Sequence, residues 1–440
     1  MRVGVIGLGH VGLPTAAALA RLGHDVTAGD RDTARVEQLT QGVMPFFEPG
    51  LEDLVADEVH AGRLRVTAEA KDVVGSSAVV FICVGTPPRA SGEADLRAVE
   101  QAAEVIATYA SGPIVVVEKS TVPAGTAERL SATLARYRRD VSFQVVSNPE
   151  FMREGYAVED SLRPARILVG SDAEEARALM AELYRPLVDA GARFIETDLT
   201  TAELAKHACN AFLALKISFV NALARLCERA DADVWSVADV MGADPRIGRA
   251  FLDAGLGYGG YCFPKDLAAF DRLSERLGYP FPLLKEVARI NDEAVDATLS
   301  LIQDSLWNLE GKRIALLGLS FKPGTDDVRF SPALALGAKL AEAGAEVVGY
   351  DPEAGENARA ELAALKVAED PYDALRGAHA AVVCTEWAEL SALDLERARE
   401  AMAFPILVDG RHAIDAKGAL EAGFTYLALG RPRAPLAHRR

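Results

Sequence analysis

The sequence has little cysteine, no long uninterrupted apolar run and no excess of positive charge. Its five cysteines are scattered along the chain and form no CxxC pair. An odd, dispersed set of this kind favours reduced thiols over a disulfide framework or a zinc site. We therefore expect a cytoplasmic protein without a bound metal.

Membranes and nucleic acids are both unfavoured as partners. No apolar run approaches the roughly 20 residues that a helix needs to cross a bilayer. The N-terminus runs directly into the strand-like residues 2–6, which predicts that no signal peptide precedes the fold. The net charge of −17 argues against nonspecific binding to nucleic acid or to an anionic membrane. A local basic pocket for a phosphorylated ligand remains compatible with that charge.

Length and composition predict a soluble globular protein with more than one domain. The chain has 440 residues, half of them hydrophobic and a quarter charged. Single hydrophobic cores rarely grow beyond about 250–300 residues. Two or three domains are therefore expected.

A dinucleotide-binding motif opens the chain. The apolar run Val3–Ile6 leads into Gly7-Leu-Gly9-His-Val-Gly12, a helical stretch follows, and the next strand ends at Asp30. Glycines in this G-x-G-x-x-G pattern allow a tight turn and the close approach of a pyrophosphate to a helix N-terminus. Asp30 is placed to accept hydrogen bonds from the adenosine ribose, and its charge repels the 2′-phosphate of NADP. The pattern predicts an NAD site.

Three further apolar runs have the near-continuous hydrophobic character of parallel strands buried on both faces. They lie at 78–84, 114–117 and 143–146, and each ends in small polar residues and proline, including Thr86, Thr121 and Glu150. Ligands of doubly wound sheets lie outside the carboxyl ends of the strands. We expect these three endings to line one crevice.

Two carboxylates follow the last of these strands. The stretch from Pro149 to Gly155 is expected to start a helix or helical turn, with Glu150 and Glu154 one turn apart on its face. Paired carboxylates at that spacing are usually solvated surface. Because these two follow a strand end in the predicted crevice, a general acid or base role is an equally good interpretation.

A long apolar helix without internal glycine or proline is predicted from Thr200 to about Arg229. Its beginning carries Glu203, Lys206 and Asn210 on one face. A helix of this length and character needs burial on more than one side, which indicates a connecting spine and a dimer contact. The alternative for its polar residues is a stripe that faces solvent.

The opening pattern starts again at Gly311. Residues 312–320 repeat the first strand and glycine turn, and residues 345–351 repeat the second strand with its terminal acid. The glycine triplet is incomplete here, so this half is not expected to bind NAD. Its segment 321–329 is suited to a different phosphorylated ligand.

The predicted fold is therefore α/β, with two doubly wound, Rossmann-like parallel-sheet domains joined by a long central helix and a helical region. The expected segments are an NAD-binding domain, a central helical domain, a second Rossmann-like domain and a disordered tail, at 1–196, 197–308, 309–430 and 431–440 respectively.

A glycine-framed cysteine is the most suggestive single feature of the central region. Four glycines between Gly255 and Gly260 precede Cys262, and Lys265 and Asp266 follow it. A thiol on a glycine-framed loop beside ionisable groups is how a nucleophile is presented to a substrate. The alternative is an incidental cysteine in a surface loop.

Six motifs in order give the chain a resemblance to a known family. They are Gly7–Gly12 with Asp30, Ser120–Pro123, Asn148–Gly155, Glu203–Lys206 with Asn210, Gly259–Asp266 and Phe321–Arg329. Over essentially its whole length the chain resembles the nucleotide-sugar 6-dehydrogenases, the family of UDP-glucose and GDP-mannose dehydrogenases. The resemblance implies that NAD is the cofactor, that a UDP-sugar is bound by the second Rossmann-like domain, and that the chain forms a homodimer through the central helix.

The resemblance also implies a reaction and roles for the motif residues. A sugar C6 alcohol is oxidised twice, through an aldehyde captured by Cys262 and a thioester that is hydrolysed to the uronic acid. Lys206 and Asn210 match the pair that stabilises the oxyanion, Asp266 and Thr121 the residues that order a water, and Glu154 the hydrolytic base. The resemblance places the cofactor on Gly7, Gly9, Gly12, Asp30, Thr86, Thr121, Lys265 and Arg329. It places the substrate on Glu150, Phe151, Glu154, Lys206, Asn210, Gly259 and Lys322, with Arg246 or Arg249 entering the partner subunit's site.

Three positions depart from the family pattern. Tyr261 stands where serine is usual, Ala165 replaces an aspartate, and His412 stands where asparagine is usual. The Arg-Glu-Gly form at 153–155 and the run from Cys262 to Asp266 favour UDP-glucose as substrate. GDP-mannose and a UDP-N-acetylhexosamine are the alternatives. A non-catalytic nucleotide-sugar sensor is an alternative from another class, and the presence of a complete set of catalytic residues argues against it.

Overall fold

The computed structural model describes residues 1–431, which form two compact units. The first unit comprises Met1–Cys209 and Ala268–Pro280, and the second comprises Asn210–Leu267 and the chain from Phe281 onward. The domain boundaries expected at 196 and 308 stay predictions. Apart from Arg431, the predicted disordered tail lies outside the described residues.

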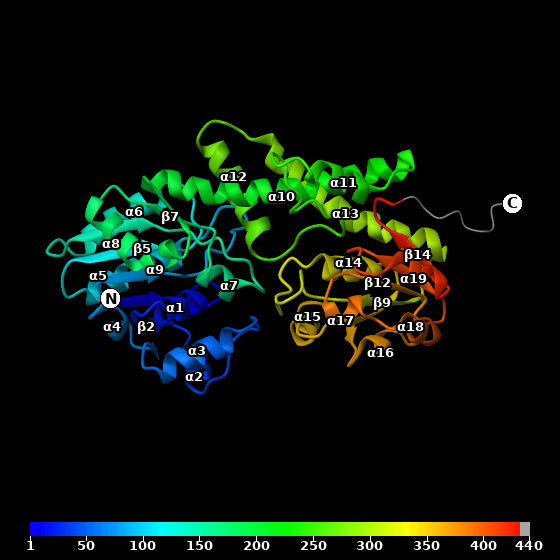
Figure 1. Ribbon diagram of the computed structural model, residues 1–440, viewed down its shortest axis with the longest axis horizontal. Helices are drawn as coiled ribbons and strands as arrows, with labels where there is room; N and C mark the ends of the chain where they lie inside the picture. Colours follow the sequence, from blue (N-terminus) through cyan, green and yellow to red (C-terminus); the bar gives the residue numbers. More distant parts are fainter. Residues whose placement is uncertain (432–440) are drawn as a thin grey trace. The chain divides into compact units, whose positions relative to one another are not determined.

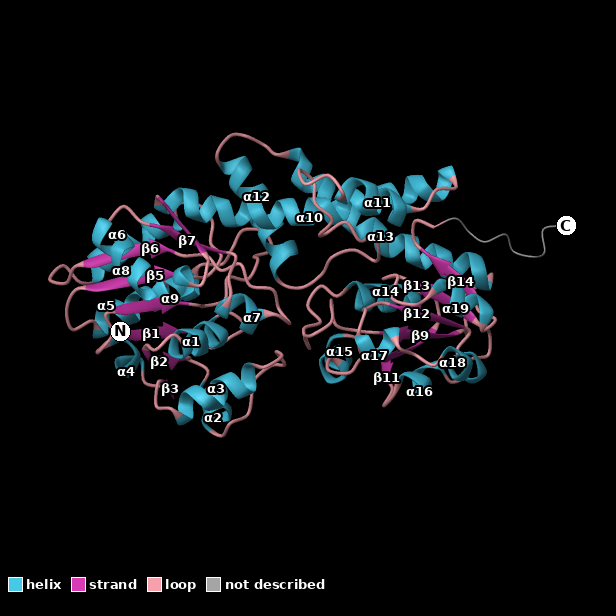
Figure 2. Ribbon diagram, in the orientation of Figure 1, coloured by secondary structure: helices cyan, strands magenta, loops and turns pink. Residues whose placement is uncertain are grey.

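An eight-stranded sheet forms the centre of the first unit (Figures 1 and 2). Its order is β3-β2-β1-β4-β5-β6-β7-β8. The strands are β1 Arg2–Ile6, β2 Asp25–Gly29, β3 Leu64–Thr67, β4 Val79–Ile82, β5 Ile114–Glu118, β6 Phe143–Ser147, β7 Arg166–Gly170 and β8 Arg193–Thr197. The strands β1 to β6 pair in parallel, so the residues after β1, β4, β5 and β6 lie at one edge of the sheet.

Helices cover both faces of this sheet. They are α1 Gly12–Arg21, α2 Thr33–Thr40, α3 Leu51–His60, α4 Ala70–Val74, α5 Arg97–Tyr109, α6 Thr126–Tyr137, α7 Ala157–Leu162, α8 Glu174–Leu183 and α9 Arg185–Asp189. One apolar core contains residues of α1, α2, α3, α8 and α9, and a second contains residues of α4, α5 and α6. Near-continuous apolar strands such as Val79–Ile82 are buried because both faces are covered.

The far edge of the sheet differs from the prediction. The strand β7 meets β6 antiparallel, through the single pair Ser147 and Gly170, so β7 and β8 run against the other strands. After β7 the chain forms two short helices, α8 and α9, in place of one long helix. Pro186 lies in the first turn of α9, where its missing N–H costs nothing, whereas inside one long helix it would remove a hydrogen bond.

The second unit repeats the doubly wound arrangement with six parallel strands in the order β11-β10-β9-β12-β13-β14. The strands are β9 Arg313–Leu317, β10 Glu346–Tyr350, β11 Leu365–Val367, β12 Ala380–Val383, β13 Ile406–Asp409 and β14 Thr425–Ala428. The helices are α11 Val234–Gly242, α13 Pro282–Leu306, α14 Pro332–Glu342, α15 Gly355–Glu361, α16 Pro371–Leu375, α17 Ala388–Ser391, α18 Leu395–Ala401 and α19 Ala416–Glu421. The predicted fold class is confirmed, since each unit contains its own doubly wound, mainly parallel sheet.

Two helices have residues in both units, α10 (Leu199–Ala230) and α12 (Cys262–Arg276). The sequence predicted one long helix from Thr200 to about Arg229, and the observed α10 is longer by one residue at each end. By length and composition α10 could cross a membrane, and core helices of soluble proteins meet the same criteria. These two properties alone do not place it in a membrane.

A buried carboxylate ties α1 to α3 in the first unit. Glu58 on α3 is fully buried, and its two oxygens accept hydrogen bonds from Arg21 Nε at 2.5 Å and Arg63 Nε at 2.6 Å. Burial raises the pKa of Glu58, but the hydrogen bonds from Arg63 and Arg21 outweigh it, so the pKa lies below its ordinary value of 4.5. The ionised carboxylate therefore stabilises the folded chain at neutral pH.

Replacing Glu58 by glutamine should lower the free energy of unfolding by about 2 kcal/mol at pH 7, because charge-assisted hydrogen bonds contribute roughly 1.5–3 kcal/mol. The folded pKa lies below the unfolded one, so the wild-type advantage should be complete above pH 4.5 and should vanish as the pH falls through the folded value. Urea denaturation at several pH values measures this difference in the free energy of unfolding. Glu52→Gln, at an exposed position of the same helix, is the matched control. Equal losses for both variants would contradict the assigned role.

Candidate active site

The glycine turn after β1 has the shape that a dinucleotide needs. Gly7 has a φ of +101°, and a Cβ added at Gly12 would lie 1.8 Å from the carbonyl oxygen of Gly7. A Cβ at Gly9, by contrast, would meet no atom within 4 Å, so the backbone there borders open space. No side chain caps the N-terminus of α1. Uncapped amides beside open space fit a pyrophosphate.

Asp30 follows β2 and reaches the same turn. Its Oδ2 accepts hydrogen bonds from the backbone N–H of Leu8 at 2.8 Å and from Arg35 Nη1 at 3.0 Å. The carboxylate is thereby held beside the glycine turn. This placement agrees with the predicted contact to a ribose.

The endings of β4 and β5 are joined by a hydrogen bond between two of the predicted residues. The hydroxyl of Thr86 donates to the carbonyl oxygen of Thr121 at 3.0 Å, and Thr86 is buried. The structure therefore brings these two strand endings together at one edge of the sheet.

A buried ion pair joins the ending of β6 to α10. Lys206 Nζ lies 2.9 Å from Glu150 Oε1, and both side chains are at least 94% buried. The Phe151 ring lies under the same ammonium, 5.3 Å from Nζ to the ring centroid, and 3.9 Å from the Arg166 guanidinium. The alternative of a solvent-facing stripe is therefore excluded for Lys206, because its charge is buried against an acid and an aromatic face.

Neither the helix nor the helical turn predicted to start at Pro149 is present at residues 149–153. Regular helix begins only at Ala157, and Glu154 lies in a turn that ends with Gly155 at a φ of +80°. The backbone amides of Gly155 and Ala157 donate instead to Glu48, each at 2.7 Å. Glu150 and Glu154 thus do not share a helix face. A distant carboxylate that binds these amides holds the segment in a turn.

Glu203 has a structural role. Its two oxygens accept hydrogen bonds from the backbone amides of Gly125 and Ala127, at 2.7 and 2.6 Å, and so cap the N-terminus of α6. Burial raises the pKa of Glu203 to about 7. This contact fastens α10 to the segment that follows Thr121.

Sequence patterns alone missed a buried network behind Glu150. Lys119 Nζ donates to Asn148 Oδ1 at 3.1 Å, Tyr184 donates to the same oxygen at 2.7 Å, and Asn148 Nδ2 donates to the carbonyl oxygen of Leu168. Burial lowers the pKa of Lys119 to about 8. The network holds Asn148 in place, two positions before Glu150. The one feature of the sequence that could have indicated this network is Lys119, a lysine directly after the buried strand β5.

In the second unit, Asp266 is the centre of a second buried polar cluster. Its Oδ2 accepts from Asn210 Nδ2 at 2.6 Å, and its Oδ1 lies 2.5 Å from Lys265 Nζ. All three residues are buried. The structure therefore brings together three of the predicted residues, Asn210 from α10 and Lys265 and Asp266 from the beginning of α12.

Cys262 is the first residue of α12 and is half-buried. The positive end of the helix dipole favours a negative charge at that position, which suits a thiolate. The preceding turn needs glycine. Gly260 has a φ of +77°, and a Cβ there would lie 2.7 Å from the Phe321 ring. At Gly259 a Cβ would lie 2.3 Å from the carbonyl oxygen of Phe330.

Tyr261 has a clear place in this cluster. Its ring lies 4.4 Å from the Arg329 guanidinium and 5.5 Å from Lys265 Nζ, measured to the ring centroid. Arg329 also forms a bidentate pair with Asp327, in which Nε donates to Oδ1 at 2.9 Å and Nη2 donates to Oδ2 at 2.6 Å. The aromatic ring that replaces the usual serine thus contacts both predicted cofactor cations of the second unit.

Lys322 Nζ lies 5.5 Å from the centroid of the Phe321 ring. The two predicted arginines pair with acids other than the predicted site residues. Arg246 pairs with Asp244 and leaves 87% of its side chain exposed. Arg249 pairs with both Asp239 and Asp253. The structure of one chain therefore does not bring either arginine to the other candidate residues.

The second glycine turn is closed by its own chain. Asp351, the counterpart of Asp30, accepts from the backbone amides of Leu319 and Ser320, at 2.7 and 2.9 Å, and from Trp387 Nε1 at 3.1 Å. An acid with these partners is poorly placed to take a ribose. This agrees with the prediction that NAD does not bind here.

A second departure from the family pattern, at His412, has a backbone explanation. His412 has a φ of +53°, a left-handed conformation that favours asparagine and that histidine also tolerates. Its Nε2 lies 2.9 Å from the carbonyl oxygen of Leu429, and burial lowers its pKa. The histidine therefore fits a position for which asparagine is the usual solution.

Comparison with known proteins agrees with this geometry. Residues 1–188 match the NAD binding domain of the UDP-glucose/GDP-mannose dehydrogenase family, residues 200–293 match its central domain, and residues 315–416 match its UDP binding domain. The matched NAD domain contains the glycine turn and Asp30.

Relatives match along the whole chain. A UDP-glucose 6-dehydrogenase from Rhizobium meliloti (strain 1021) is 45% identical over 436 residues, which cover 98% of this chain and all of the relative. One from Bacillus subtilis (strain 168) is 40% identical over 433 residues, covering 98% and 93%. The structure of a UDP-glucose dehydrogenase from the archaeon Pyrobaculum islandicum superposes with a TM-score of 0.91 at 38% identity and covers 98% of both chains. The chain belongs to the UDP-glucose/GDP-mannose dehydrogenase family and is an NAD-dependent oxidoreductase.

Proposed function

We propose that the protein oxidises the C6 alcohol of UDP-glucose to the carboxylate of UDP-glucuronate, with two NAD⁺ reduced for each sugar. The observation that best supports this proposal is the buried group of Asn210, Lys265 and Asp266 near Cys262 on α12. The chain also matches a UDP-glucose 6-dehydrogenase over 98% of its length. A buried carboxylate between an amide and an ammonium, next to a thiol at a helix N-terminus, suits covalent chemistry at a carbonyl.

The cofactor belongs to the first unit. Gly7, Gly9 and Gly12 would hold its pyrophosphate and Asp30 its ribose, since the turn is open above Gly9 and the acid is fixed beside it. When bound, NAD⁺ accepts the hydride that leaves C6 in each oxidation. Thr86, Thr121, Lys265 and Arg329 complete the proposed contacts.

Lys206 and Asn210 act on the oxygen at C6. Oxidation requires the hydroxyl to lose its proton, and negative charge grows on that oxygen as the carbon is attacked. An ammonium and an amide on successive turns of α10 are donors suited to that charge. Removing one donor of this kind typically costs about 3–4 kcal/mol of barrier.

Cys262 holds the intermediates. Its thiolate forms an S–C bond to the aldehyde carbon while the carbonyl electron pair moves to oxygen, and loss of a second hydride leaves a thioester. Water then adds to the thioester, the S–C bond breaks, and the sulfur regains a proton. Glu154 takes the proton from water, which Asp266 and Thr121 orient. The covalent bond retains the reactive aldehyde while the cofactor is exchanged.

Further residues recognise the sugar nucleotide. Glu150, Phe151 and Gly259 shape the pocket around the sugar, and Lys322 contacts the nucleotide. Arg246 or Arg249 acts in the partner subunit's site, in agreement with the exposure of Arg246. A UDP-sugar is supported by the match of residues 315–416 to the family's UDP binding domain.

We place the protein in the cytoplasm, as a homodimer through α10 and as a supplier of uronic acids for polysaccharide biosynthesis. Phe212, Phe219 and Leu226 recur every seven residues on α10, and each is at least half exposed. Large apolar side chains at this spacing form one stripe along a helix, which is the usual seam of a helix pair.

The reaction is tested by absorbance at 340 nm with NAD⁺ and a panel of UDP- and GDP-sugars. We expect turnover with UDP-glucose and two NADH for each sugar consumed. A preference for GDP-mannose or a UDP-N-acetylhexosamine would overturn the substrate assignment. One NADH per sugar would exclude the double oxidation. If no sugar nucleotide gave NADH, the non-catalytic nucleotide-sugar sensor would remain as the function.

Cys262→Ala should bind UDP-glucose with an affinity close to that of the parent but lose production of UDP-glucuronate by about a thousandfold or more, because the nucleophile is removed. Calorimetry and chromatography of the product measure the two quantities. Cys209→Ala, which alters another half-buried thiol, is the matched control and should stay active. Normal acid production by Cys262→Ala would exclude the covalent route.

Asp30→Ala should raise the KM for NAD⁺ by about 10- to 100-fold, as expected for losing a charge-assisted hydrogen bond of roughly 1.5–3 kcal/mol. Discrimination against NADP⁺ should also fall, since the repelling charge is gone. Steady-state kinetics with both cofactors checks this. Asp25→Ala, at the exposed start of the same strand, serves as the control. An unchanged KM for NAD⁺ would show that the ribose contact is misassigned.

A further inference from the structure

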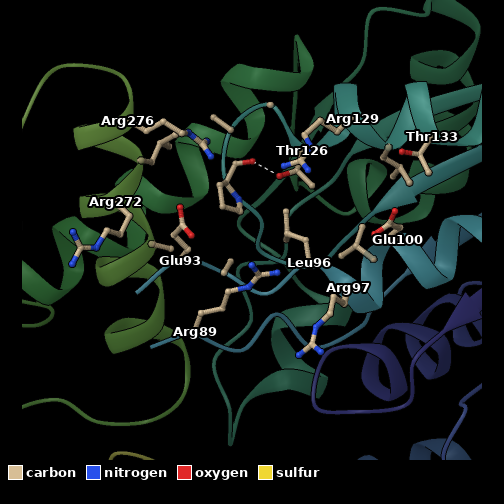
Figure 3. Close-up of a pocket in the computed structure, with 18 of the residues that line it drawn as sticks. Arg89, Glu93, Leu96, Arg97, Glu100, Thr126, Arg129, Thr133, Arg272 and Arg276 are labelled. Atoms are coloured by element: carbon tan, nitrogen blue, oxygen red, sulfur yellow. Dashed lines mark hydrogen bonds between the residues drawn. The ribbon is translucent and has the colours of Figure 1, made fainter. Parts of the chain in front are cut away.

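The first unit contains a cavity whose lining is rich in arginine. Its volume is about 470 Å³, and residues from the loop after β4, from α5, from α6 and from α12 line it (Figure 3). Five arginines and two glutamates are among these residues, in a chain whose net charge is −17. None of the lining residues belongs to the proposed cofactor or substrate contacts.

The arginines divide into two groups. Arg97 and Arg272 are held in ion pairs, with Asp95 at 2.5 Å and with Glu275 at 2.7 Å, and Figure 3 shows both directed away from the middle of the cavity. Arg89, Arg129 and Arg276 come from three different segments and turn toward it (Figure 3). Three guanidinium groups that converge on one cavity are separated along the chain, so no single charged segment accounts for them.

These three arginines have few partners in the part of the chain that the structure describes. The Arg89 side chain makes one long contact to Asp95 at 3.3 Å, and the side chains of Arg129 and Arg276 make no hydrogen bond or ion pair within residues 1–431. The lining residues Glu93 and Glu100 offset part of the charge of these three arginines, and the positive excess that remains favours an anionic ligand. Guanidinium groups bind phosphate oxygens in a bidentate way, which makes phosphate the favoured anion.

The rest of the lining suits an organic group. Leu96, Val99, Leu130 and Leu273 contribute apolar surface to the same cavity. The amides at the start of α6 are already taken by Glu203, so the arginines and not the helix N-terminus must hold the anion. We propose that this cavity binds an organic di- or triphosphate, such as a nucleoside triphosphate, as an additional ligand.

The test is calorimetric titration of the full chain with tripolyphosphate and with GTP, in an excess of NADH and UDP so that the proposed cofactor and substrate sites are filled. We expect one ligand per chain. GTP should bind about tenfold more tightly than tripolyphosphate because its base can cover the apolar residues. Equal affinities would overturn the organic part of the proposal, and absence of stoichiometric binding would overturn all of it.

A double variant locates the site. Arg129→Gln with Arg276→Gln should weaken GTP binding by at least about 30-fold, since two charge-assisted contacts are lost. The matched control is Arg136→Gln with Arg139→Gln, which removes the same charge from exposed positions on and just after α6. Equal weakening in both variants would show a nonspecific charge effect. Circular dichroism and turnover of UDP-glucose verify that each variant is folded.

Sedimentation of the same samples tests whether a second copy of the chain, and not a ligand, fills the cavity. If a second copy of the chain fills the cavity, the wild-type chain should bind no GTP and the Arg129/Arg276 variant should change its oligomeric mass. That result would overturn the proposal. An unchanged mass together with lost GTP binding supports it.

Discussion

Charged side chains lie buried at the carboxyl ends of the strands and at the ends of the long helices, and each requires a partner. Removing a carboxylate or an ammonium from water is costly unless an opposite charge or several hydrogen bonds replace the solvent. Glu150 has Lys206, Asp266 has Asn210 and Lys265, and Glu203 has two backbone amides. Within each unit, these pairings hold the buried charges in place before any ligand binds. Pre-organised donors and acceptors are what electrostatic catalysis requires.

The two units show how one topology can serve two ligands. In both, an acid at the end of the second strand accepts a hydrogen bond from the glycine turn after the first strand. Asp30 leaves a turn that borders open space, whereas Asp351 is surrounded by backbone amides and the Trp387 indole. The shared strand order therefore fixes where a ligand can lie, and a few side chains at the turn decide which ligand it is.

Much of the site could be predicted because its chemistry depends on local sequence. The glycine turn, Asp30, the cysteine loop and the polar residues of α10 are separated by short, fixed spacings that a helix or a turn converts directly into geometry. The failures have a different origin. The helix expected at Pro149 is replaced by a turn because Glu48, more than a hundred residues away, takes two of its amides. Likewise, Tyr261 could not be interpreted before Arg329 and Lys265 were seen against its ring.

By itself the sequence determined the doubly wound fold, because periodicity and glycine spacing depend on neighbours along the chain. Its motifs also identified the family, and the family resemblance in turn implied the cofactor and the candidate residues. Only the tertiary structure decided which acid accompanies which base. In the structure Glu150 forms an ion pair with Lys206, Asp266 accepts a hydrogen bond from Asn210, and Glu203 caps a helix. It also assembled three arginines from separate segments around one cavity. Contacts of this kind join residues that are distant along the chain, and burial selects them only after the strands and helices have packed.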